Sequence, residues 1–319
     1  MEKSKFFLGV DGGGSKTTAV VFSENGEFIC KSCGESINYY SVGLENARQA
    51  MKDIIQSLEI KHFDCAVIGM SALNERATAE ETERFCGGII DSECTIMDSD
   101  LFVALEAMAV DGECAAVISG TGSMAVCRNN YGVISHAGGW GYILGDEGSG
   151  YAIGLSGIKA AIKSAENCAP ETALLGECLK YFSVDSIYDL IDLYYEKGVS
   201  RKITAAFAQV VNECAENGDS LAENIIEYEA EELSNTALGL LKEFKKDVPI
   251  GLWGGVFQNN VIFRDKFTDC LKFENYSNVK LIRFTPEVGA VFAGYKCCGV
   301  EIVENIKNNV LKTYINGNV

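Results

Sequence analysis

The sequence predicts an α/β protein built from two repeated domains. Short apolar and β-branched runs alternate with helical stretches, a pattern typical of parallel strands joined by helices. A glycine turn follows an apolar strand twice, at Gly12-Gly13-Gly14-Ser15 and at Gly120-Thr121-Gly122-Ser123. Each turn leads into a second strand, an asparagine turn and a third strand, and such an internal repeat predicts duplicated domains. At 319 residues the chain is long enough for two domains.

The first domain is expected to open with a buried strand at Phe6–Val10, which ends at Asp11. The β-branched run Thr17–Phe22 predicts the second strand. Asn25-Gly26 then favours a type I′ hairpin turn before a third strand at Phe28. Further helices are expected over 45–58, 78–86 and 101–108, and further strands over 66–70 and 94–97.

The second domain is expected to repeat this order and then to become mostly helical. Strands are expected over 115–119, 123–127, 131–135, 249–253 and 280–282, and helices over 151–165 and 220–244, after the turn at 254–259, and from Thr285-Pro286 onward. We place the boundary near Gly112-Glu113, which gives domains 1–113 and 114–319. The second domain then carries a helical insertion, and its last helix is able to pack back on the first domain.

Composition excludes several classes of protein. The net charge of −18 and the pI near 4.6 argue against nucleic acid and anionic membrane as partners, because both require a basic face. The thirteen cysteines are scattered without the local spacing of a four-ligand metal site, so we expect reduced thiols in a cytoplasmic protein. No apolar run approaches the roughly 20 residues of a membrane-spanning helix.

The first glycine turn predicts a phosphate site. Glycines let backbone N–H groups surround an anion, and Asp11 at the strand end is placed to hold a hydrated Mg²⁺ beside it. A Walker loop requires Gly-Lys-Ser/Thr before a helix, but Ser15 separates Gly14 from Lys16 and a strand follows. A Rossmann fingerprint fails because Thr17 stands where the third glycine is required. Taken alone, the turn is also compatible with an ordinary tight hairpin.

Two acids follow another predicted strand, in Asp98-Ser99-Asp100. Either carboxylate is a candidate catalytic base, and both are also compatible with a structural role at a strand end or helix N-cap. A glycine-rich block over 138–150 contains Trp140, Asp146 and Glu147 and precedes a helix. Trp140 alone is compatible with a core position.

These motifs together carry a resemblance. The two glycine turns and Gly254-Gly255 resemble the actin, hexokinase and Hsp70 ATPase superfamily. Gly138-Gly139-Trp140-Gly141 with Gly145-Asp146-Glu147-Gly148-Ser149, and Ser36-Ile37-Asn38 followed by Gly43, resemble the N-acetylglucosamine kinase branch of the BadF/BadG/BcrA/BcrD ATPase family. The resemblance runs from about Phe6 to Gly294. It implies two duplicated ribonuclease-H-like, actin-like ATPase domains with a nucleotide cleft between them.

The resemblance also implies roles for individual residues. Asp100, which directly precedes a helix, matches the catalytic base, and Asp11 matches a ligand of Mg²⁺ through water. The residues that match the sugar-binding set are Asn38, Gly139, Trp140, Gly141 and Asp146. Those that match the ATP-binding set are Gly12, Gly13, Gly14, Ser15, Lys16, Thr17, Gly120, Thr121, Gly122, Ser123, Ala205, Gly254, Gly255 and Asn259. Glu147 is expected to orient its loop.

The function implied is an ATP-dependent amino-sugar kinase that phosphorylates the 6-hydroxyl of N-acetylglucosamine or a close relative. Alternatives are a kinase for N-acetylmuramic acid, whose lactyl carboxylate would require a nearby cation, or for glucosamine. An ATPase activator of 2-hydroxyacyl-CoA dehydratases would need a cluster-binding cysteine motif that we do not find in the sequence. A sugar-sensing repressor would need a helix-turn-helix extension. The resemblance further implies a homodimer.

Overall fold

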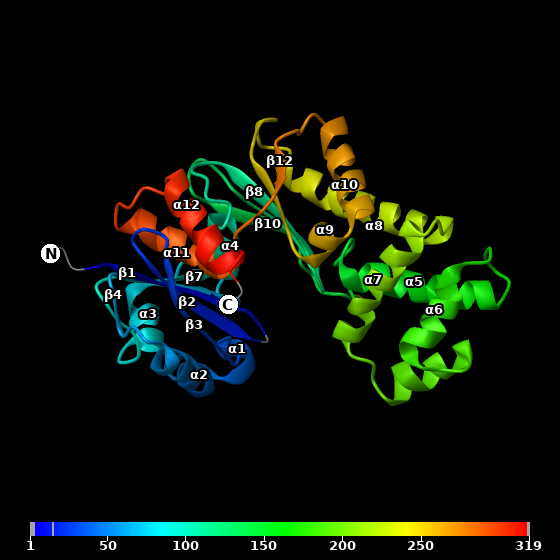
Figure 1. Cartoon of the computed structure of the whole chain (residues 1–319), viewed down its shortest axis with the longest axis horizontal. Helices are drawn as coiled ribbons and strands as arrows, with labels where there is room; N and C mark the ends of the chain where they lie inside the picture. Colours follow the sequence, from blue (N-terminus) through cyan, green and yellow to red (C-terminus); the bar gives the residue numbers. More distant parts are fainter. Residues whose placement is uncertain (1–3, 15, 318–319) are drawn as a thin grey trace. The chain divides into compact units, whose positions relative to one another are not determined.

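A computed structural model describes residues 4–14 and 16–317 of the chain (Figure 1). The chain forms two compact units, hereafter unit 1 (Met1–Gly112 and Ile282–Val319) and unit 2 (Glu113–Leu281). Within the described part, no helix combines the length and the apolar content that a membrane span requires.

Unit 1 is built on a five-stranded sheet in the order β3-β2-β1-β5-β7. The first three strands form an antiparallel meander, and β5 and β7 run parallel to β1. Because the parallel strands end at the same edge, the residues that follow them are brought together. The strands are β1 (Phe6–Gly12), β2 (Thr17–Ser23), β3 (Phe28–Gly34), β5 (Cys65–Met70) and β7 (Thr95–Ser99), with a separate pair β4 (His62–Phe63) and β6 (Asp91–Ser92).

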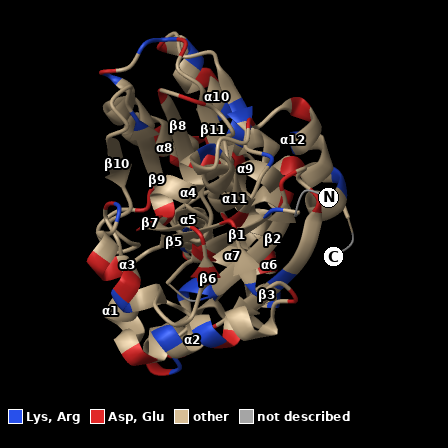
Figure 2. Cartoon of the chain, turned by 90° about the vertical axis from the view of Figure 1, so that its left-hand side faces the viewer, with Lys and Arg blue, Asp and Glu red and all other residues tan. Residues whose placement is uncertain are grey.

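Helices cover both faces of this sheet. On one face, the apolar stripe of α2 packs against alternate residues of β1, including Leu8 and Val10. On the other face, α11 packs on β1, β5 and α4, with Tyr295 against Phe7. Figure 2 shows acidic and basic segments alternating along α2, as expected for a half-exposed amphipathic helix. The helices are α1 (Tyr39–Val42), α2 (Leu44–Ser57), α3 (Ala79–Cys86), α4 (Asp100–Glu106), α11 (Pro286–Cys297) and α12 (Glu304–Val310), followed by η3 (Leu311–Ile315).

The sheet of unit 2 repeats the topology of unit 1, which confirms the predicted duplication. Its order is β10-β9-β8-β11-β12, again with an antiparallel meander followed by two parallel strands. The strands are β8 (Cys114–Ser119), β9 (Ser123–Arg128), β10 (Ile134–Gly138), β11 (Ile250–Trp253) and β12 (Val279–Leu281).

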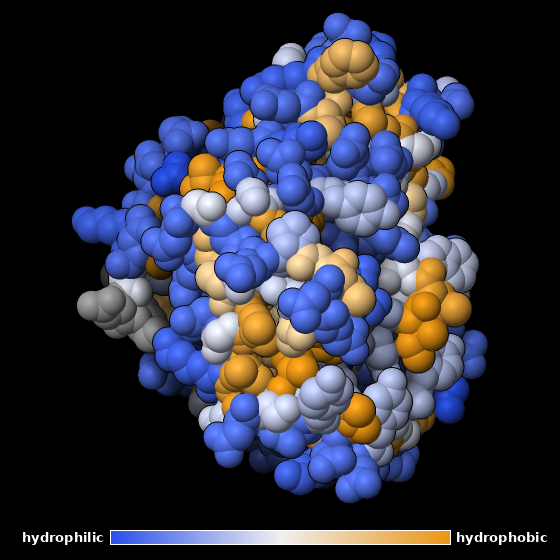
Figure 3. Space-filling view, turned by 90° about the vertical axis from the view of Figure 1, so that its right-hand side faces the viewer, coloured by the Kyte–Doolittle hydropathy of each residue, from blue (hydrophilic) through white to orange (hydrophobic). Residues whose placement is uncertain are grey.

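The helices of unit 2 form a large core with its sheet. Helices α5 and α7 pack closely, because Gly154 leaves no side chain between them: a Cβ there would lie 2.0 Å from the carbonyl oxygen of Thr204. Figure 3 shows apolar side chains exposed among polar ones on the α5–α7 side of unit 2. The helices are α5 (Gly150–Ala165), α6 (Ala173–Phe182), η1 (Ile187–Asp189), η2 (Asp192–Glu196), α7 (Arg201–Glu216), α8 (Ser220–Leu241), α9 (Gly255–Asn259) and α10 (Val261–Phe273).

The structure differs from the expectations in three places. Residues 282–319 belong to unit 1, whereas the sequence-based division counted them with residues 114–319. The Asn25-Gly26 turn is not type I′, because Gly26 has a positive φ and Asn25 does not. Strand β10 begins three residues late, since the Asn129 side chain accepts hydrogen bonds from the N–H groups of Tyr131 and Val133 and extends the turn.

Candidate active site

The carboxylates of unit 1 gather where its parallel strands end. Asp11 pairs in register with Gly69 of β5, and Gly69 pairs with Asp98 of β7. Burial, followed by the negative charges of Glu287 and Asp100, raises the pKa of Asp11 to about 7, although Lys16 acts in the opposite direction. Burial also raises the pKa of Asp100, at the first position of α4. This group of buried carboxylates is a setting that a divalent cation stabilises.

The two acids around Ser99 have different surroundings. Asp98 is 5% exposed and pairs with Arg76, whose Nε lies 3.1 Å from Oδ2. Its other oxygen accepts from the backbone N–H of Ser99 at 2.8 Å. Asp98 is therefore held by structural partners, whereas Asp100 interacts electrostatically with Asp11 at the strand ends. This difference favours Asp100 over Asp98 as the reactive carboxylate.

The turn between β1 and β2 is tight and partly open to solvent. The N–H of Gly13 donates to the carbonyl of Lys16 at 3.1 Å, and Gly14 has no atom within 4 Å of the position a Cβ would take. Thr17 is fully buried, and its hydroxyl donates to the carbonyl of Glu35, whereas Gly14 and Lys16 are exposed. Ser15 lies outside the described residues.

Asn38 caps the short helix α1. Its Oδ1 accepts from the N–H groups of Tyr40 and Ser41, and its Nδ2 donates to the hydroxyl of Ser71 at 3.0 Å. An amide has two N–H donors, so one of them remains for a ligand. Ser71 directly follows β5, which places Asn38 beside the strand ends that hold Asp11.

The matching turn of unit 2 is joined to two neighbouring segments. The N–H of Gly150, at the start of α5, donates to the carbonyl of Gly120 at 2.7 Å. A Cβ at Gly254 would lie 2.2 Å from the carbonyl oxygen of Ser119, and its φ of 108° is one that other residues rarely adopt. The predicted phosphate turn and the predicted adenosine loop therefore meet backbone to backbone.

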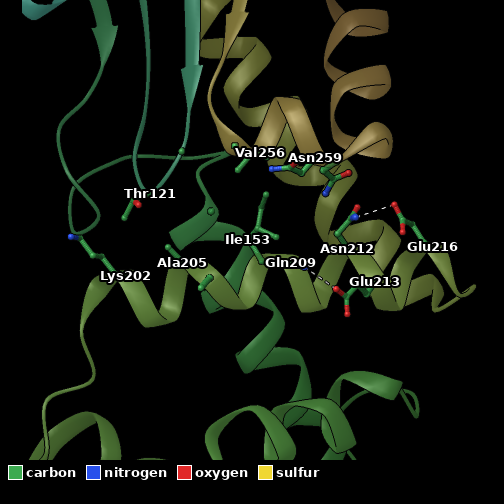
Figure 4. A pocket seen from close by; sticks show the side chains of 16 residues that line it. Thr121, Ile153, Lys202, Ala205, Gln209, Asn212, Glu213, Glu216, Val256 and Asn259 are labelled. Atoms are coloured by element: carbon green, nitrogen blue, oxygen red, sulfur yellow. Dashed lines mark hydrogen bonds between the residues drawn. The ribbon is translucent and has the colours of Figure 1, made fainter. Parts of the chain in front are cut away.

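A cavity of about 720 Å³ lies within unit 2, a size typical of small-molecule sites. Figure 4 shows α7 along one side and the 120–121 turn and α9 along the other. The lining residues include the predicted set Gly120, Thr121, Ala205, Gly255 and Asn259. Five residues from three segments that are distant in the sequence thus line the same pocket.

The two ends of this pocket differ in charge. Thr121 and Lys202 lie at one end, and Asn212 and Glu216 lie at the other, about 15 Å further along α7 (Figure 4). The Asn212 amide donates to Glu216 at 3.0 Å, and its Oδ1 is buried without a hydrogen-bond partner in the described structure. A cationic end suits phosphate, and an unpartnered acceptor beside a carboxylate suits the hydroxyl or amino donors of a nucleoside.

The 138–149 loop, which contains the predicted sugar-binding residues, is fastened to the phosphate turn. The hydroxyls of Ser119 and Ser123 donate to the carbonyls of Gly148 and Glu147, each at 2.6 Å. Glu229 of α8 accepts a hydrogen bond from the N–H of Gly148, so this buried carboxylate also anchors the loop.

Trp140 is 73% exposed and is therefore not a core residue. Gly139 and Gly141 on either side of it both have positive φ values, which turn the backbone so that the indole lies on the surface. The tryptophan is consequently accessible to a ligand.

Asp146 has both carboxylate oxygens occupied. Oδ1 accepts from the N–H of Gly141 at 3.2 Å, and Oδ2 lies 3.1 Å from Nη2 of Arg201. This ion pair lies against the phosphate turn, since a Cβ at Gly122 would meet both partners. The Nε of Arg201 is buried without a partner among the described groups, so the guanidinium retains a donor.

Sequence reasoning missed Arg201, Lys202, Asn212 and Glu229. Ser200 caps α7 and precedes Arg201, which is four residues before Ala205 and so lies on the same face of the helix. That spacing was the available signal for Arg201. The surroundings of Asn212 and Glu229 depend on how α5, α7 and α8 pack, and no local sequence pattern indicates that packing.

Two sheets of the same order, each with a glycine turn after its first strand, are typical of the two-domain actin-like fold, and one of the two units contains a polar pocket of nucleotide size. The chain belongs to the BadF/BadG/BcrA/BcrD ATPase family, whose model matches residues 8–294.

Characterised relatives span almost the whole chain. The N-acetylmuramic acid/N-acetylglucosamine kinase of Clostridium acetobutylicum is 33% identical over 87% of this chain and 94% of its own length. The N-acetyl-D-glucosamine kinase of Dictyostelium discoideum is 27% identical over 90% of this chain and 96% of its own. A solved structure from Chromobacterium violaceum, assigned to the N-acetylglucosamine kinases, shares the fold with a TM-score of 0.66, at 19% identity over 90% of this chain and 98% of that one.

Proposed function

We propose that this protein is an ATP-dependent amino-sugar kinase that transfers the γ-phosphate to the 6-hydroxyl of N-acetylglucosamine or a close relative. The observation that carries the proposal is the 33% identity along 94% of the length of a kinase for N-acetylmuramic acid and N-acetylglucosamine. The strand-end carboxylates and the polarised pocket supply the two functions that such a kinase needs, a base and a nucleotide site.

The unit 2 pocket fits ATP by its donor and acceptor chemistry. Backbone N–H groups of the 120–122 turn and the Lys202 ammonium would bind phosphate oxygens. Asn212 and Glu216 would accept hydrogen bonds from the nucleoside, which gives the unpartnered Oδ1 of Asn212 a donor. Ala205 and Val256 offer apolar surface for the base.

Mg²⁺ fits the strand-end acids of unit 1. Asp11 is a hard oxygen ligand that burial and neighbouring acids make costly to ionise, and a hydrated divalent cation would offset that cost. When bound, the metal would neutralise charge on the transferring phosphate. The exposed Gly14 and Lys16 would add a backbone N–H and an ammonium donor for the phosphate, while Gly12 and Gly13 would shape the turn.

Asp100 would accept the proton of the 6-hydroxyl as that oxygen attacks phosphorus. A positioned base typically contributes about 10²–10⁴-fold to the rate. Burial raises the pKa of Asp100, which makes it a stronger base than an ordinary aspartate.

Asn38 and the 139–141 segment would hold the sugar. Asn38 has one N–H donor left for a hydroxyl, and the exposed indole of Trp140 offers a face for the ring. Asp146 would act by fixing Gly141 and Arg201. Arg201 makes N-acetylmuramic acid a second candidate substrate, because its partly exposed guanidinium could bind the lactyl carboxylate.

A coupled ATP-consumption assay over hexoses, glucosamine, N-acetylglucosamine and N-acetylmuramic acid tests the proposal. We expect amino sugars to stimulate ATP turnover and mass spectrometry to detect the 6-phosphate. If no sugar stimulates turnover by correctly folded protein with Mg²⁺, the proposal fails. A homodimer and a cytoplasmic location remain predictions, and light scattering of the purified protein would test the first.

A further inference from the structure

Four cysteines of unit 1 gather at the edge of the sheet where β5 and β7 begin. Cys65 is the first residue of β5, and Cys94 directly precedes β7. The N–H of Ala66 donates to the carbonyl of Cys94 at 2.9 Å, which fixes the two strand starts side by side. Cys297 ends α11 and Cys298 caps it, so the helix brings its last turn to the same place.

The sulfur atoms are spaced as ligands of one metal ion. The Sγ atoms of Cys65, Cys94 and Cys297 all lie within 4.8 Å of one another, and those of Cys94 and Cys297 are 3.8 Å apart. Tetrahedral zinc with Zn–S bonds of about 2.3 Å places its sulfur ligands about 3.8 Å from each other. Small side-chain rotations would therefore complete three metal–sulfur bonds.

Cys298 is not one of the three sulfurs that all lie within 4.8 Å of one another, but it adjoins them and offers a fourth thiol. It interacts with both Cys65 and Cys297, and Lys5 and Asp64 are its charged neighbours. One turn earlier, a Cβ at Gly294 would lie 3.6 Å from the Cys65 sulfur, so the end of α11 is in contact with β5. Four cysteinyl sulfurs in tetrahedral arrangement are typical of structural zinc.

We propose that Cys65, Cys94 and Cys297, with Cys298 as the fourth ligand, bind one thiophilic metal ion, for which Zn²⁺ is the best-fitting candidate. A disulfide would use only two of these three or four thiols. Carboxylates, which would favour Mg²⁺ or Ca²⁺, are not among the ligands.

The proposed metal site lies at the opposite ends of the strands from Asp11 and Asp100. The two acids lie at the C-terminal ends of β1 and β7, and the thiols of Cys65 and Cys94 lie at the N-terminal ends of β5 and β7. Helix α11 connects the two edges, from Glu287 in its first turn to Cys297 at its end. A metal ion here would fasten α11 to β5 and β7, so it would stabilise unit 1 without taking part in catalysis. The inference does not depend on the identity of the substrate.

The test uses the full chain, reduced and stripped of metal by a chelator, and titrated with Zn²⁺ against a chromophoric zinc indicator. We expect one Zn²⁺ per chain, a higher melting temperature on binding, and at least tenfold weaker binding by Cys94→Ser. Cys168→Ser is the matched control, because Cys168 is an exposed thiol in unit 2 and should leave zinc binding unchanged. Equal binding by Cys94→Ser, or no binding by the unchanged protein, would overturn the proposal.

A second measurement needs no variant and covers the case in which Cys94→Ser does not fold. Zn²⁺ should protect Cys94 and Cys297 from alkylation, measured by mass spectrometry, while Cys168 stays reactive. Cd²⁺ should produce the ultraviolet charge-transfer absorption of three or four thiolates. Unprotected cysteines, a Cys94–Cys297 disulfide in protein that binds no zinc, or an iron–sulfur chromophore would each contradict the site.

Discussion

Units 1 and 2 have the same strand order but place different chemistry after the first strand. In unit 1 the next-to-last residue of that strand is Asp11, a carboxylate grouped with Asp100. In unit 2 the matching residue is Ser119, which is fully buried and donates its hydroxyl to the carbonyl of Gly148. The repeated fold therefore provides one glycine turn in each unit, and the two turns differ in the side chain beside them. Asp11 adds a carboxylate to the turn of unit 1, whereas the hydroxyl of Ser119 fixes the neighbouring loop in unit 2.

The comparison extends to what surrounds each turn. The unit 1 turn is followed by the short helix α1 and the Asn38 cap, whereas the unit 2 turn is enclosed by α5, α7 and α9, which form a pocket. We infer a division of labour, with acid chemistry in unit 1 and nucleotide binding in unit 2. Changes to unit 1 acids should accordingly lower kcat, and changes to the unit 2 pocket should raise the KM for ATP.

The largest effect is expected from Asp100→Asn. Removal of the proposed base should lower kcat by about 10²–10⁴-fold with little change in the KM for ATP. The steady-state rate over a range of ATP and sugar concentrations gives both values. Asp98→Asn is the matched control on the same segment, because Asp98 pairs with Arg76 and should affect stability more than kcat. A full rate for Asp100→Asn would contradict the assignment.

The free energy of unfolding should depend on pH because the Asp11 carboxyl titrates at different pH values in the folded and unfolded chain. Because its folded-state pKa is about 7 instead of the ordinary 3.8, the folded protein keeps a proton that the unfolded chain releases. Stability from this group is thus fully present below about pH 4 and is lost as the pH rises to about 7. Between pH 5 and 8 the loss should be about 2–3 kcal/mol, an upper bound for a fully shielded group.

Urea unfolding in the presence of a chelator measures this loss, with Asp11→Asn as the reference. The difference in unfolding free energy between the two proteins should change with pH in favour of the variant, and Mg²⁺ should reduce it. A pH-independent difference would show that Asp11 is not the buried titrating group.

Gly254→Ala tests the backbone contact between the two loops of unit 2. The added Cβ would lie 2.2 Å from the carbonyl of Ser119 at a φ of 108°, so we expect a loss of about 1–3 kcal/mol in stability and a raised KM for ATP. Gly255→Ala, one residue later, meets no atom closer than 3.8 Å and begins a helix, so it should leave stability unchanged or slightly higher. Equal unfolding midpoints for the two variants would contradict the close backbone contact between Gly254 and Ser119.

The fold and the family could be predicted because their signals are local. The strand beginning at Phe6, the glycine turns and the apolar stripe of α2 are each contained within a few residues, and the observed topology and the family match confirm what they predicted. The exact start of β10 was missed because a side-chain cap at Asn129, not hydrophobicity, decides it.

Only those residues of the candidate site that lie in glycine motifs or at strand ends could be predicted from the sequence. Arg201 is 55 residues from Asp146, and Cys297 is 203 residues from Cys94, so neither pair leaves a spacing pattern in the sequence. Such partners meet because helices α7 and α11 pack in a particular register. The fine assignment of the sugar-binding residues stays a prediction for the same reason.

Substitution of Asn212 is expected to give the smallest effect, and it separates a role in nucleotide binding from a role in the stability of the fold. Its Oδ1 is buried without a partner among the described residues, so Asn212→Ala removes an acceptor that the ligand-free protein does not use, together with the amide's hydrogen bond to Glu216. We therefore expect little loss in melting temperature and a KM for ATP raised about two- to tenfold, the value of one hydrogen bond. Gln209→Ala is the matched control on the same helix, because it removes the same kind of bond, an amide that donates at 3.0 Å to the carboxylate four residues later. If Asn212→Ala lowers the melting temperature but leaves the KM for ATP unchanged, the acceptor serves the fold, and the nucleoside end of the pocket must be assigned elsewhere.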